Sequence, residues 1–342
     1  MVPVVDSQQK PLMPCSEKRA RQMIASRKAT PFWKHGIFCI RLNIEPSARN
    51  MQPIAVGVDP GSKKEGFTVK SESHTYLNIQ ADAVTWVKDA VKTRREMRRG
   101  RRFRKTPCRQ NRKNRARGGL APSTKARWQW KLRVCRWLAK LFPISRFVVE
   151  DIKAWTKGQR RWDVMFSPLE IGKQWFYEEL EKISPVDLKQ GYETKELRDN
   201  LGLKKTSKKL DDVFEAHCVD SWVLANWHVG GHDAPDNKRM LLMTPLHFHR
   251  RQLHRLQPAK GGERSPYGGT RSLGFKRGSL AHHSKHGLVY VGGFLKDRLC
   301  LHSIETGKRL CQNAKPTETK FLAFNTWRGR SSQSPKGDGF PR

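Results

Sequence analysis

Residues 54–67, IAVGVDPGSKKEGF, place an aspartate directly after an apolar run and before a Pro-Gly pair. The run 54–58 is rich in β-branched residues, which predicts a buried strand that ends at Asp59. An aspartate before Pro-Gly is often a simple turn former. Its place at the end of a buried strand also makes it a candidate functional carboxylate, and the rest of the sequence must decide between these two interpretations.

The segments that follow have the order of a mixed α/β domain. Residues 53–87 predict a three-strand meander with strands at 54–58, 66–69 and 75–79. Residues 119–231 then predict helix, strand, helix and helix; the strand ends at Glu150, and a capping box of Ser167 and Glu170 predicts the start of the next helix. The last helix, from about 207 to 227, carries His217 and Asp220 on one face, because they are three residues apart.

This order of elements is that of an RNase H-type fold. In such a fold Asp59 and Glu150 meet on adjacent central strands, and the final helix brings Asp220 to them. Clustered carboxylates suit two Mg²⁺ ions that hold the attacking water and the leaving oxygen of a phosphodiester. Taken singly, Glu150 also fits a solvated strand end and His217 an ordinary helix histidine. The ordered combination favours a metal site.

The charge of the chain indicates its partner. Its 342 residues carry 68 Lys+Arg against 31 Asp+Glu, a formal net charge of +37, which favours nucleic acid over an acidic membrane surface. No apolar stretch reaches the roughly 18 residues of a spanning helix, and the N-terminus shows no secretory signal, so we expect no membrane association and a cytoplasmic location. The seven cysteines form no C-x-x-C pair, which argues against a disulfide framework or a thiolate zinc site.

The segment 88–117 is strongly basic, since half of its residues are Lys or Arg. A solvated charged segment is the ordinary interpretation of such a run. Arginine dominates, however, and suits bidentate phosphate contact, while Val91, Met97 and Phe103 offer sparse apolar anchoring. We therefore expect an RNA-contacting helix whose nucleic-acid-binding side chains are Arg94, Arg95, Arg98, Arg99, Arg101, Arg102, Arg104, Lys105, Arg109 and Arg112.

The two ends of the chain predict small separate modules. Residues 1–52 predict strands at 2–5 and 38–42 around a helix that is capped by Ser16 and runs over 17–29. Residues 232–342 predict a small β-barrel-like domain with strands at 288–291, 299–304, 309–311 and 321–324, a Thr306-Gly307 turn, and a disordered tail from 328. The pattern of His247 and His249 is too weak to indicate a zinc site.

Several motifs together resemble those of the IscB/IsrB group of transposon-encoded, RNA-guided nucleases: PLMP at 11–14, VDPGSKKEGF at 58–67, RRGRR at 98–102, VVED at 148–151, and His217 with Asp220. The stretch between Glu150 and Ser207 has no His-Asn-His pattern, so the chain resembles IsrB, the branch that lacks the HNH nuclease. The implied fold class is α/β, an RNase H-like (RuvC) mixed-sheet core with an inserted Arg-rich bridge helix.

The resemblance also implies a division of the chain. The implied parts are a PLMP module (1–52), RuvC segment I (53–87), a bridge helix (88–118), RuvC segments II and III (119–231), and a C-terminal domain that reads a target-adjacent motif (232–342). It implies a Mg²⁺-dependent endonuclease with two ions, or Mn²⁺ in their place, that nicks the displaced DNA strand. The implied partners are one large structured guide RNA per protein and the guide–DNA heteroduplex.

The resemblance assigns roles to the candidate residues. Asp59, Glu150 and Asp220 would bind the metal ions, and His217 would activate the attacking water or orient the metal shell, with Asp211 and Asp212 as reserve carboxylates. The C-terminal domain would be either a platform for guide RNA or, as we favour, also a reader of duplex DNA. Two other functions stay open: a guide-free RNase H-like resolvase or transposase, and an RNA-binding protein without nuclease activity.

Overall fold

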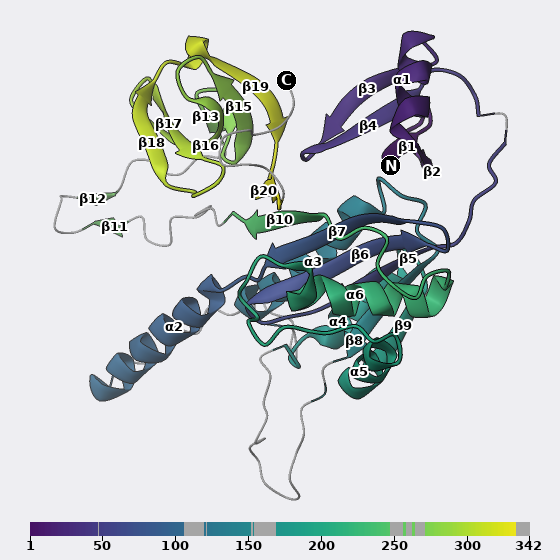
Figure 1. Cartoon of the computed structure of the whole chain (residues 1–342). Helices are drawn as coiled ribbons and strands as arrows, with labels where there is room; N and C mark the ends of the chain where they lie inside the picture. The colour runs from purple at the N-terminus through teal and green to yellow at the C-terminus, as the bar shows by residue number, and fades with distance from the viewer. Residues whose placement is uncertain are drawn as a thin grey trace, which may run out of the picture. The chain divides into compact units, whose positions relative to one another are not determined.

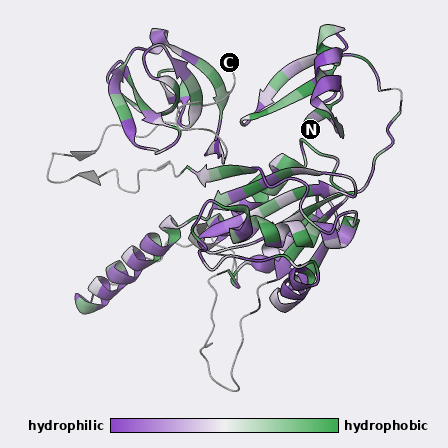
Figure 2. Cartoon of the chain, in the orientation of Figure 1, coloured by the Kyte–Doolittle hydropathy of each residue, from purple (hydrophilic) through white to green (hydrophobic). Residues whose placement is uncertain are grey.

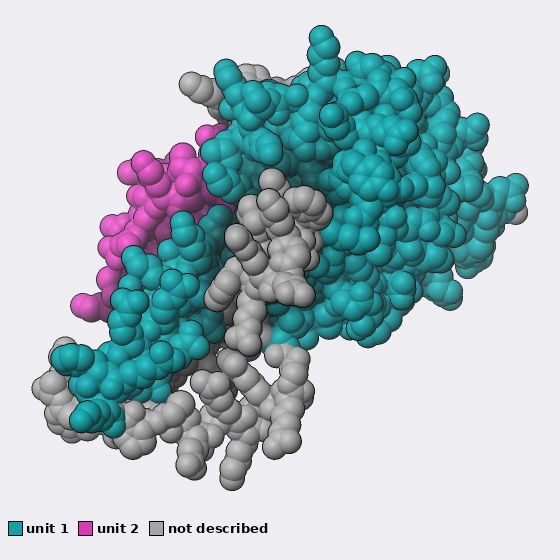
Figure 3. Space-filling model, turned by 90° about the horizontal axis from the view of Figure 1, so that it is seen from below, with its two compact units in different colours: residues 1–32, 38–241 teal, residues 33–37, 242–342 magenta. Residues whose placement is uncertain are grey.

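The computed structural model describes residues 1–46, 48–105, 120, 122–151, 153, 169–246, 256–257, 262–263 and 271–332. The chain divides into two compact units, which Figure 3 colours separately. Unit 1 comprises residues 1–32 and 38–241, and unit 2 comprises residues 33–37 and 242–342.

The N-terminal module is a four-stranded sheet with one helix. Its strands have the order β2-β1-β4-β3, and its elements are β1 (Val2–Val5), β2 (Pro11–Cys15), α1 (Glu17–Ala25), β3 (Ala29–Lys34) and β4 (Ile37–Leu42). Ser16 caps α1 as predicted, by accepting a hydrogen bond from the backbone N–H of Arg19. The prediction was wrong about the end of the helix, because Arg27 has a positive φ of 56° and the chain turns there into β3.

The central sheet of unit 1 contains five strands in the order β7-β6-β5-β8-β9 (Figure 1). Strand β5 pairs antiparallel with β6, and β6 with β7, whereas β5 pairs parallel with β8, and β8 with β9. The strands are β5 (Ile54–Asp59), β6 (Lys64–Ser71), β7 (Thr75–Asp82), β8 (Arg146–Asp151) and β9 (Val186–Gln190). A meander that continues into parallel strands in this order is an RNase H-like core, so the predicted fold class is confirmed.

Helices cover both faces of this sheet. On one face, Lys131 of α3 (Pro122–Leu138) is paired with Glu65 of β6, and Trp128 of α3 stacks on Phe176 of α4 (Lys173–Glu181) with ring centroids 4.9 Å apart. The next residue of β6, Gly66, points to the opposite face, where α6 (Phe214–Val229) lies. Residues of β5 and β6 that share the orientation of Gly66 therefore face α6.

Two glycines let α6 lie directly on the strands. A Cβ atom at Gly57 of β5 would lie 1.8 Å from the carbonyl oxygen of Ser221, and one at Gly66 would lie 2.3 Å from that of His217. Buried polar contacts fix the same interface: the hydroxyls of Thr68 and Ser221 are 2.9 Å apart. The absence of side chains at two positions thus sets how closely α6 approaches β5 and β6.

Four further elements of unit 1 differ from the predictions. The helix expected from the capping box begins only at Lys173, because the residues from Leu169 form a turn and Gly172 has a positive φ of 96°; Ser167 lies outside the described residues. The last helix begins at Phe214 instead of about 207, since residues 203–213 are not helical. Strand β9 and helix α5 (Gly191–Asn200) were missed, because β9 is short and none of its residues is fully buried.

Unit 2 contains a curved antiparallel sheet with the order β18-β17-β16-β15-β19 (Figure 1). Its strands are β15 (Ser279–His283), β16 (Gly287–Leu295), β17 (Arg298–Ser303), β18 (Arg309–Ala314) and β19 (Thr319–Phe324). Ala281, Val289, Val291, Leu299 and Leu301 form its core. The strands and the Thr306-Gly307 turn predicted here are therefore present.

Short elements complete the description: β10 (Met240–Pro245), β11 (Leu256–Gln257), β12 (Gly262–Glu263), β13 (Arg271–Ser272), β14 (Phe275–Lys276), a 3₁₀ turn (Pro316–Glu318) and β20 (Trp327–Ser331). The tail predicted from residue 328 was wrong for residues 328–331, which belong to β20; residues 333–342, like His247 and His249, lie outside the described part of the chain. Among the described helices, none is long and apolar enough to cross a membrane.

Candidate active site

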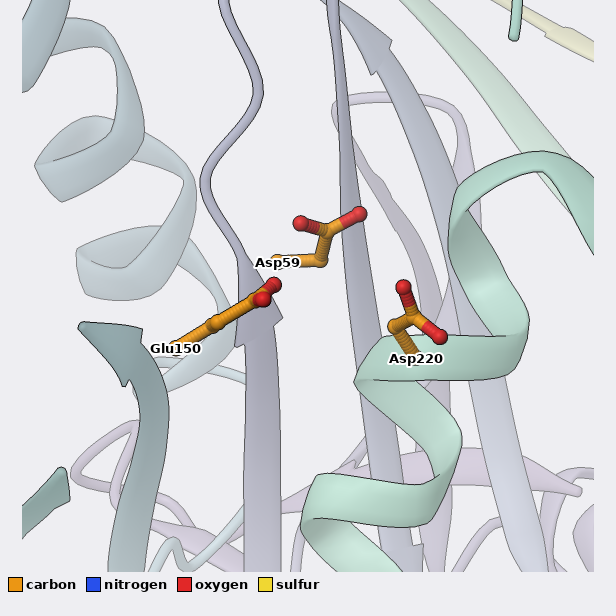
Figure 4. A group of neighbouring side chains, drawn as sticks. All are labelled: Asp59, Glu150 and Asp220. Atoms are coloured by element: carbon orange, nitrogen blue, oxygen red, sulfur yellow. The ribbon is translucent and has the colours of Figure 1, made fainter. Parts of the chain in front are cut away.

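Three carboxylates from distant parts of the sequence converge at one end of the central sheet (Figure 4). Asp59, Glu150 and Asp220 each offer an oxygen, and these oxygens lie within 4.8 Å of one another. Val58 pairs with Val149 in parallel register, so Asp59 and Glu150 follow at the carboxyl ends of neighbouring strands. Asp220 comes from α6. The structure therefore brings together the three residues that the sequence singled out.

His217 joins the cluster through Asp59. Its Nδ1 lies 2.9 Å from Asp59 Oδ2, and its Nε2 lies 3.1 Å from the carbonyl oxygen of Lys209. Both partners are acceptors, so a neutral imidazole donates to only one of them at a time. With a proton on Nδ1, His217 donates to Asp59 Oδ2 and orients this carboxylate.

Two cations that the sequence analysis missed hold Asp220. Arg198 of α5 donates from Nη1 to Oδ1 at 2.6 Å, and Lys205 donates from Nζ to Oδ2. The Asp220 side chain is only 3% exposed, so these two partners provide its charge compensation. No local pattern marks either residue, because α5 and the segment before α6 approach Asp220 only in the folded chain.

The carboxylates of the cluster titrate differently because they are crowded. Burial, followed by the neighbouring charge of Asp59, raises the pKa of Glu150 to about 9. Burial also pushes the pKa of Asp59 upward, but the hydrogen bond from His217 and the charge of Lys205 outweigh it and hold the pKa below its usual value. Of the two, Glu150 is therefore the carboxyl that favours its protonated form in the metal-free protein.

This donor set fits a divalent cation. Carboxylate oxygens are the ligands that Mg²⁺ and Mn²⁺ prefer, and a divalent ion would supply the positive charge for which Glu150 otherwise retains a proton. Among the residues that the structure describes, these three form the one group of its kind. The buried acidic cluster is thus a candidate metal site, while the role of each residue stays a prediction.

Neighbouring contacts fix the position of Glu150. The next residue, Asp151, accepts hydrogen bonds from Lys173 and Tyr177 of α4 at 2.8 and 2.9 Å. A Cβ atom at Gly191, the first residue of α5, would lie 2.9 Å from Glu150 Oε1, so a larger residue there would make the carboxylate shift. The end of β8 is therefore anchored on one side and tightly enclosed on the other.

The reserve carboxylates do not join the cluster. Asp211 and Asp212 were expected on the last helix, but they precede it. Asp212 pairs with Lys64 at 2.5 Å and accepts from Gln80 Nε2 at 3.2 Å. These contacts tie the segment 201–213 to β6 and β7, so Asp212 has a structural role in place of the predicted reserve.

The basic run forms a helix, α2 (Trp86–Phe103), that is followed by Arg104 and Lys105. Only Val87 of this helix is buried, and Figure 2 shows hydrophilic residues along most of its length. Arg94 and Arg101 are half-buried, while the exposed members of the predicted set are Arg95, Arg98, Arg99, Arg102, Arg104 and Lys105. Arg109 and Arg112 lie outside the described residues.

Comparisons with known proteins give one family model and solved structures to which this chain is similar. A family model described as "RRXRR protein" matches residues 2–160, a range that includes Asp59, the RRGRR motif and Glu150 but ends before Asp220. Among solved structures, T. thermophilus RuvC in complex with a Holliday junction substrate matches with 13% sequence identity over 53% of this chain and 98% of that chain, at a TM-score of 0.29. A search of curated protein sequences finds no match.

The sheet order is that of an RNase H-like core, and the acidic cluster lies at one end of this sheet. Asp59 and Glu150 stand at the ends of the two central parallel strands, and Asp220 reaches them from the helix on the adjacent face. The chemistry that this arrangement can support is metal-assisted cleavage of a phosphodiester.

Proposed function

We propose that this protein is an RNA-guided DNA endonuclease of the IsrB type, which nicks the displaced strand of its target in a Mg²⁺- or Mn²⁺-dependent reaction. The observation that carries the proposal is the convergence of Asp59, Glu150 and Asp220, with His217 beside them, on an RNase H-like core. The match of residues 2–160 to the RRXRR family model and the exposed arginines of α2 support the guide-RNA part.

In the proposed reaction Asp59, Glu150 and Asp220 hold the metal ions. Divalent ions held there would supply the chemistry that activates a water molecule and stabilises the leaving oxygen. His217, with a proton on Nδ1, donates to Asp59 Oδ2 and so orients this carboxylate for the metal shell. Arg198 keeps Asp220 oriented through its 2.6 Å contact with Oδ1. Glu150 gives up the proton that crowding imposes on it in the metal-free protein.

Guidance would come from RNA pairing, as in other RNA-guided nucleases, with the protein contacting backbones. The arginines of α2 are suited to this, because guanidinium groups bind phosphates bidentately. One nuclease site can cut one strand, and the displaced strand is the single-stranded one. We propose this protein as a nickase for that reason.

The test uses the protein with its co-purified RNA and a matched duplex labelled on each strand in turn. Asp59→Asn, Glu150→Gln and Asp220→Asn should each lower Mg²⁺-dependent nicking by about 10³-fold or more, because a two-ion site loses a ligand, while target binding persists. Glu181→Gln, an exposed change at the end of α4, is the control. Efficient nicking by Asp59→Asn would refute the site. Efficient cleavage of the guide-paired strand would refute the proposed strand choice, and nicking without any bound RNA would favour a guide-free enzyme.

We further propose that unit 2 contacts duplex DNA beside the target. The strands of unit 2 carry basic residues, among them Lys276, Arg298 and Lys320, and base-edge readout needs a folded surface. A chain that ends at Leu241 should still bind guide RNA but fail to engage its target in a filter-binding assay. Retained preference for the flanking sequence in that shortened chain would contradict the role of unit 2.

A further inference from the structure

Asp220 has more cationic partners than a metal ligand needs. Each of its two oxygens accepts a hydrogen bond from a cation, Oδ1 from Arg198 and Oδ2 from Lys205. A carboxylate that binds a divalent ion must offer an oxygen to it. A divalent ion bound beside Asp220 would repel both cations, so we expect the less firmly held of the two to move aside when the site is loaded.

The two cations differ in how firmly they are held. Arg198 lies on helix α5, and its side chain is 13% exposed. Lys205 lies in the non-helical segment 201–213, and its side chain is 24% exposed. A lysine ammonium on a flexible four-carbon stem is also a point charge that can be directed at another anion, whereas a guanidinium is fixed by its planar fork. Lys205 is the partner that can exchange.

The segment that carries Lys205 is anchored around the site. The carbonyl oxygen of Lys209 faces His217 Nε2, that of Asp211 accepts from Gln80, and the carboxylate of Asp212 is paired with Lys64. Lys205 can therefore change partner by rotating its own side chain, while the backbone of the segment stays beside the carboxylates.

We propose that Lys205 is a positioning residue with two successive partners: it holds Asp220 in the metal-free protein, and it contacts a phosphate of the DNA strand once a divalent ion has taken its place at Asp220. The inference rests on the proposed nuclease function. Charge balance supports the exchange, because two divalent ions together with Arg198 would already exceed the negative charge of the three carboxylates. Two divalent ions would leave Lys205 as surplus positive charge, and the anion that enters the site with the substrate is a phosphate.

The first experiment measures ion binding without nucleic acid. Full-length protein freed of RNA is titrated with Mn²⁺ by calorimetry, as wild type, Lys205→Met, Lys205→Arg and Lys208→Met. Lys208 is an exposed lysine of the same segment and controls for the removal of one nearby charge. If the ammonium competes for Asp220, Lys205→Met should bind Mn²⁺ about tenfold more tightly, which corresponds to about 1.4 kcal/mol. Lys208→Met should stay within about twofold of wild type on the same scale.

The second experiment measures nicking by the RNA-loaded protein against Mg²⁺ concentration. Lys205→Met should lower both the Mg²⁺ concentration for half-maximal rate and the maximal rate itself, the latter by about tenfold, because the DNA phosphate then has no ammonium beside it. Lys205→Arg, which keeps a cation, should recover most of the maximal rate. A variant that was merely misfolded would need more Mg²⁺ and also react more slowly.

The two experiments test the exchange of Lys205 separately from the proposed nuclease function. Unchanged or weaker Mn²⁺ binding by Lys205→Met, or an equal gain by Lys208→Met, would overturn the exchange at Asp220. An unchanged maximal rate in Lys205→Met would overturn the phosphate contact. If the wild-type protein never nicks DNA, the proposed function and the phosphate contact both fail, whereas the Mn²⁺ titration still decides whether Lys205 competes for Asp220.

Discussion

Replacing Gly57 by alanine should move the site residues of α6 away from Asp59 at the end of β5. The new Cβ atom would lie 1.8 Å from the carbonyl oxygen of Ser221 and 2.9 Å from the backbone nitrogen of Ala225. Ordinary contact begins at 3.4 Å, so the gap is about 1.6 Å too short. Both atoms belong to the backbone of α6, and no side-chain rotation relieves the clash. Helix α6 must move away from β5.

That movement would displace Asp220 and His217 relative to Asp59. Metal ligands tolerate errors of about 0.2 Å, and a misplacement of about 1 Å in an active site costs about 10²-fold in rate. We expect Gly57→Ala to bind Mn²⁺ at least about tenfold more weakly and to nick about 10²-fold more slowly. Overpacking should also lower the free energy of unfolding by about 1–3 kcal/mol.

The assays are Mn²⁺ calorimetry and thermal unfolding of the full-length protein, with Gly100→Ala as the control. Gly100 lies in helix α2, where the nearest atom to a new Cβ is a guanidinium nitrogen of Arg104 at 3.8 Å. Alanine there should stabilise the helix by about 0.5–1 kcal/mol and leave Mn²⁺ binding unchanged. If Gly57→Ala bound Mn²⁺ and melted like the wild type, the close approach of α6 would not be what positions Asp220.

Two further predictions concern the basic helix and a buried ion pair. Replacing Arg98, Arg99, Arg101 and Arg102 by alanine should weaken guide-RNA binding. It should also flatten the slope of log affinity against log salt concentration, by about 0.7 for each single-stranded phosphate that is no longer neutralised. Filter binding at several salt concentrations measures this slope, and an unchanged slope would mean that these arginines do not contact the RNA. Burial raises the pKa of Glu65 to about 7 from 4.5, although Lys131 Nζ lies 2.6 Å away. Because the folded pKa is the higher one, the contribution of Glu65 to stability is complete below pH 4.5 and is lost as the pH rises through about 7. In urea unfolding with EDTA present, Glu65→Gln should therefore flatten the dependence of the unfolding free energy on pH between pH 4.5 and about 7. An unaltered pH dependence would contradict the raised pKa of Glu65.

Much of the fold and the candidate site was accessible from local patterns. Alternating and β-branched runs marked the strands of the meander, because a strand's side chains show the environments of its two faces. The end of β5 at Asp59 and that of β8 near Glu150 were visible as ends of apolar runs. The three-residue spacing of His217 and Asp220 put both on one helical face.

Other predictions failed where the local signal was weak or contradicted. The sequence Ser167-Pro168-Leu169-Glu170 has the composition of a capping box, but the helix begins at Lys173. Strand β9 has too few buried residues to show an alternating apolar and polar pattern. Asp212 fell within the helix expected from about residue 207, yet it lies in the segment before α6, where it is paired with Lys64 of β6.

The sequence by itself determined which residues carry charge, which faces are apolar and where strands end, because these properties depend on near neighbours. Only the tertiary structure decided that Arg198 and Lys205 meet Asp220, and that Gly57 and Gly66 admit the backbone of α6. The physical reason is that such contacts join residues far apart in the chain. Their distances are set by how closely a helix packs on a sheet, and neither periodicity nor composition encodes that distance.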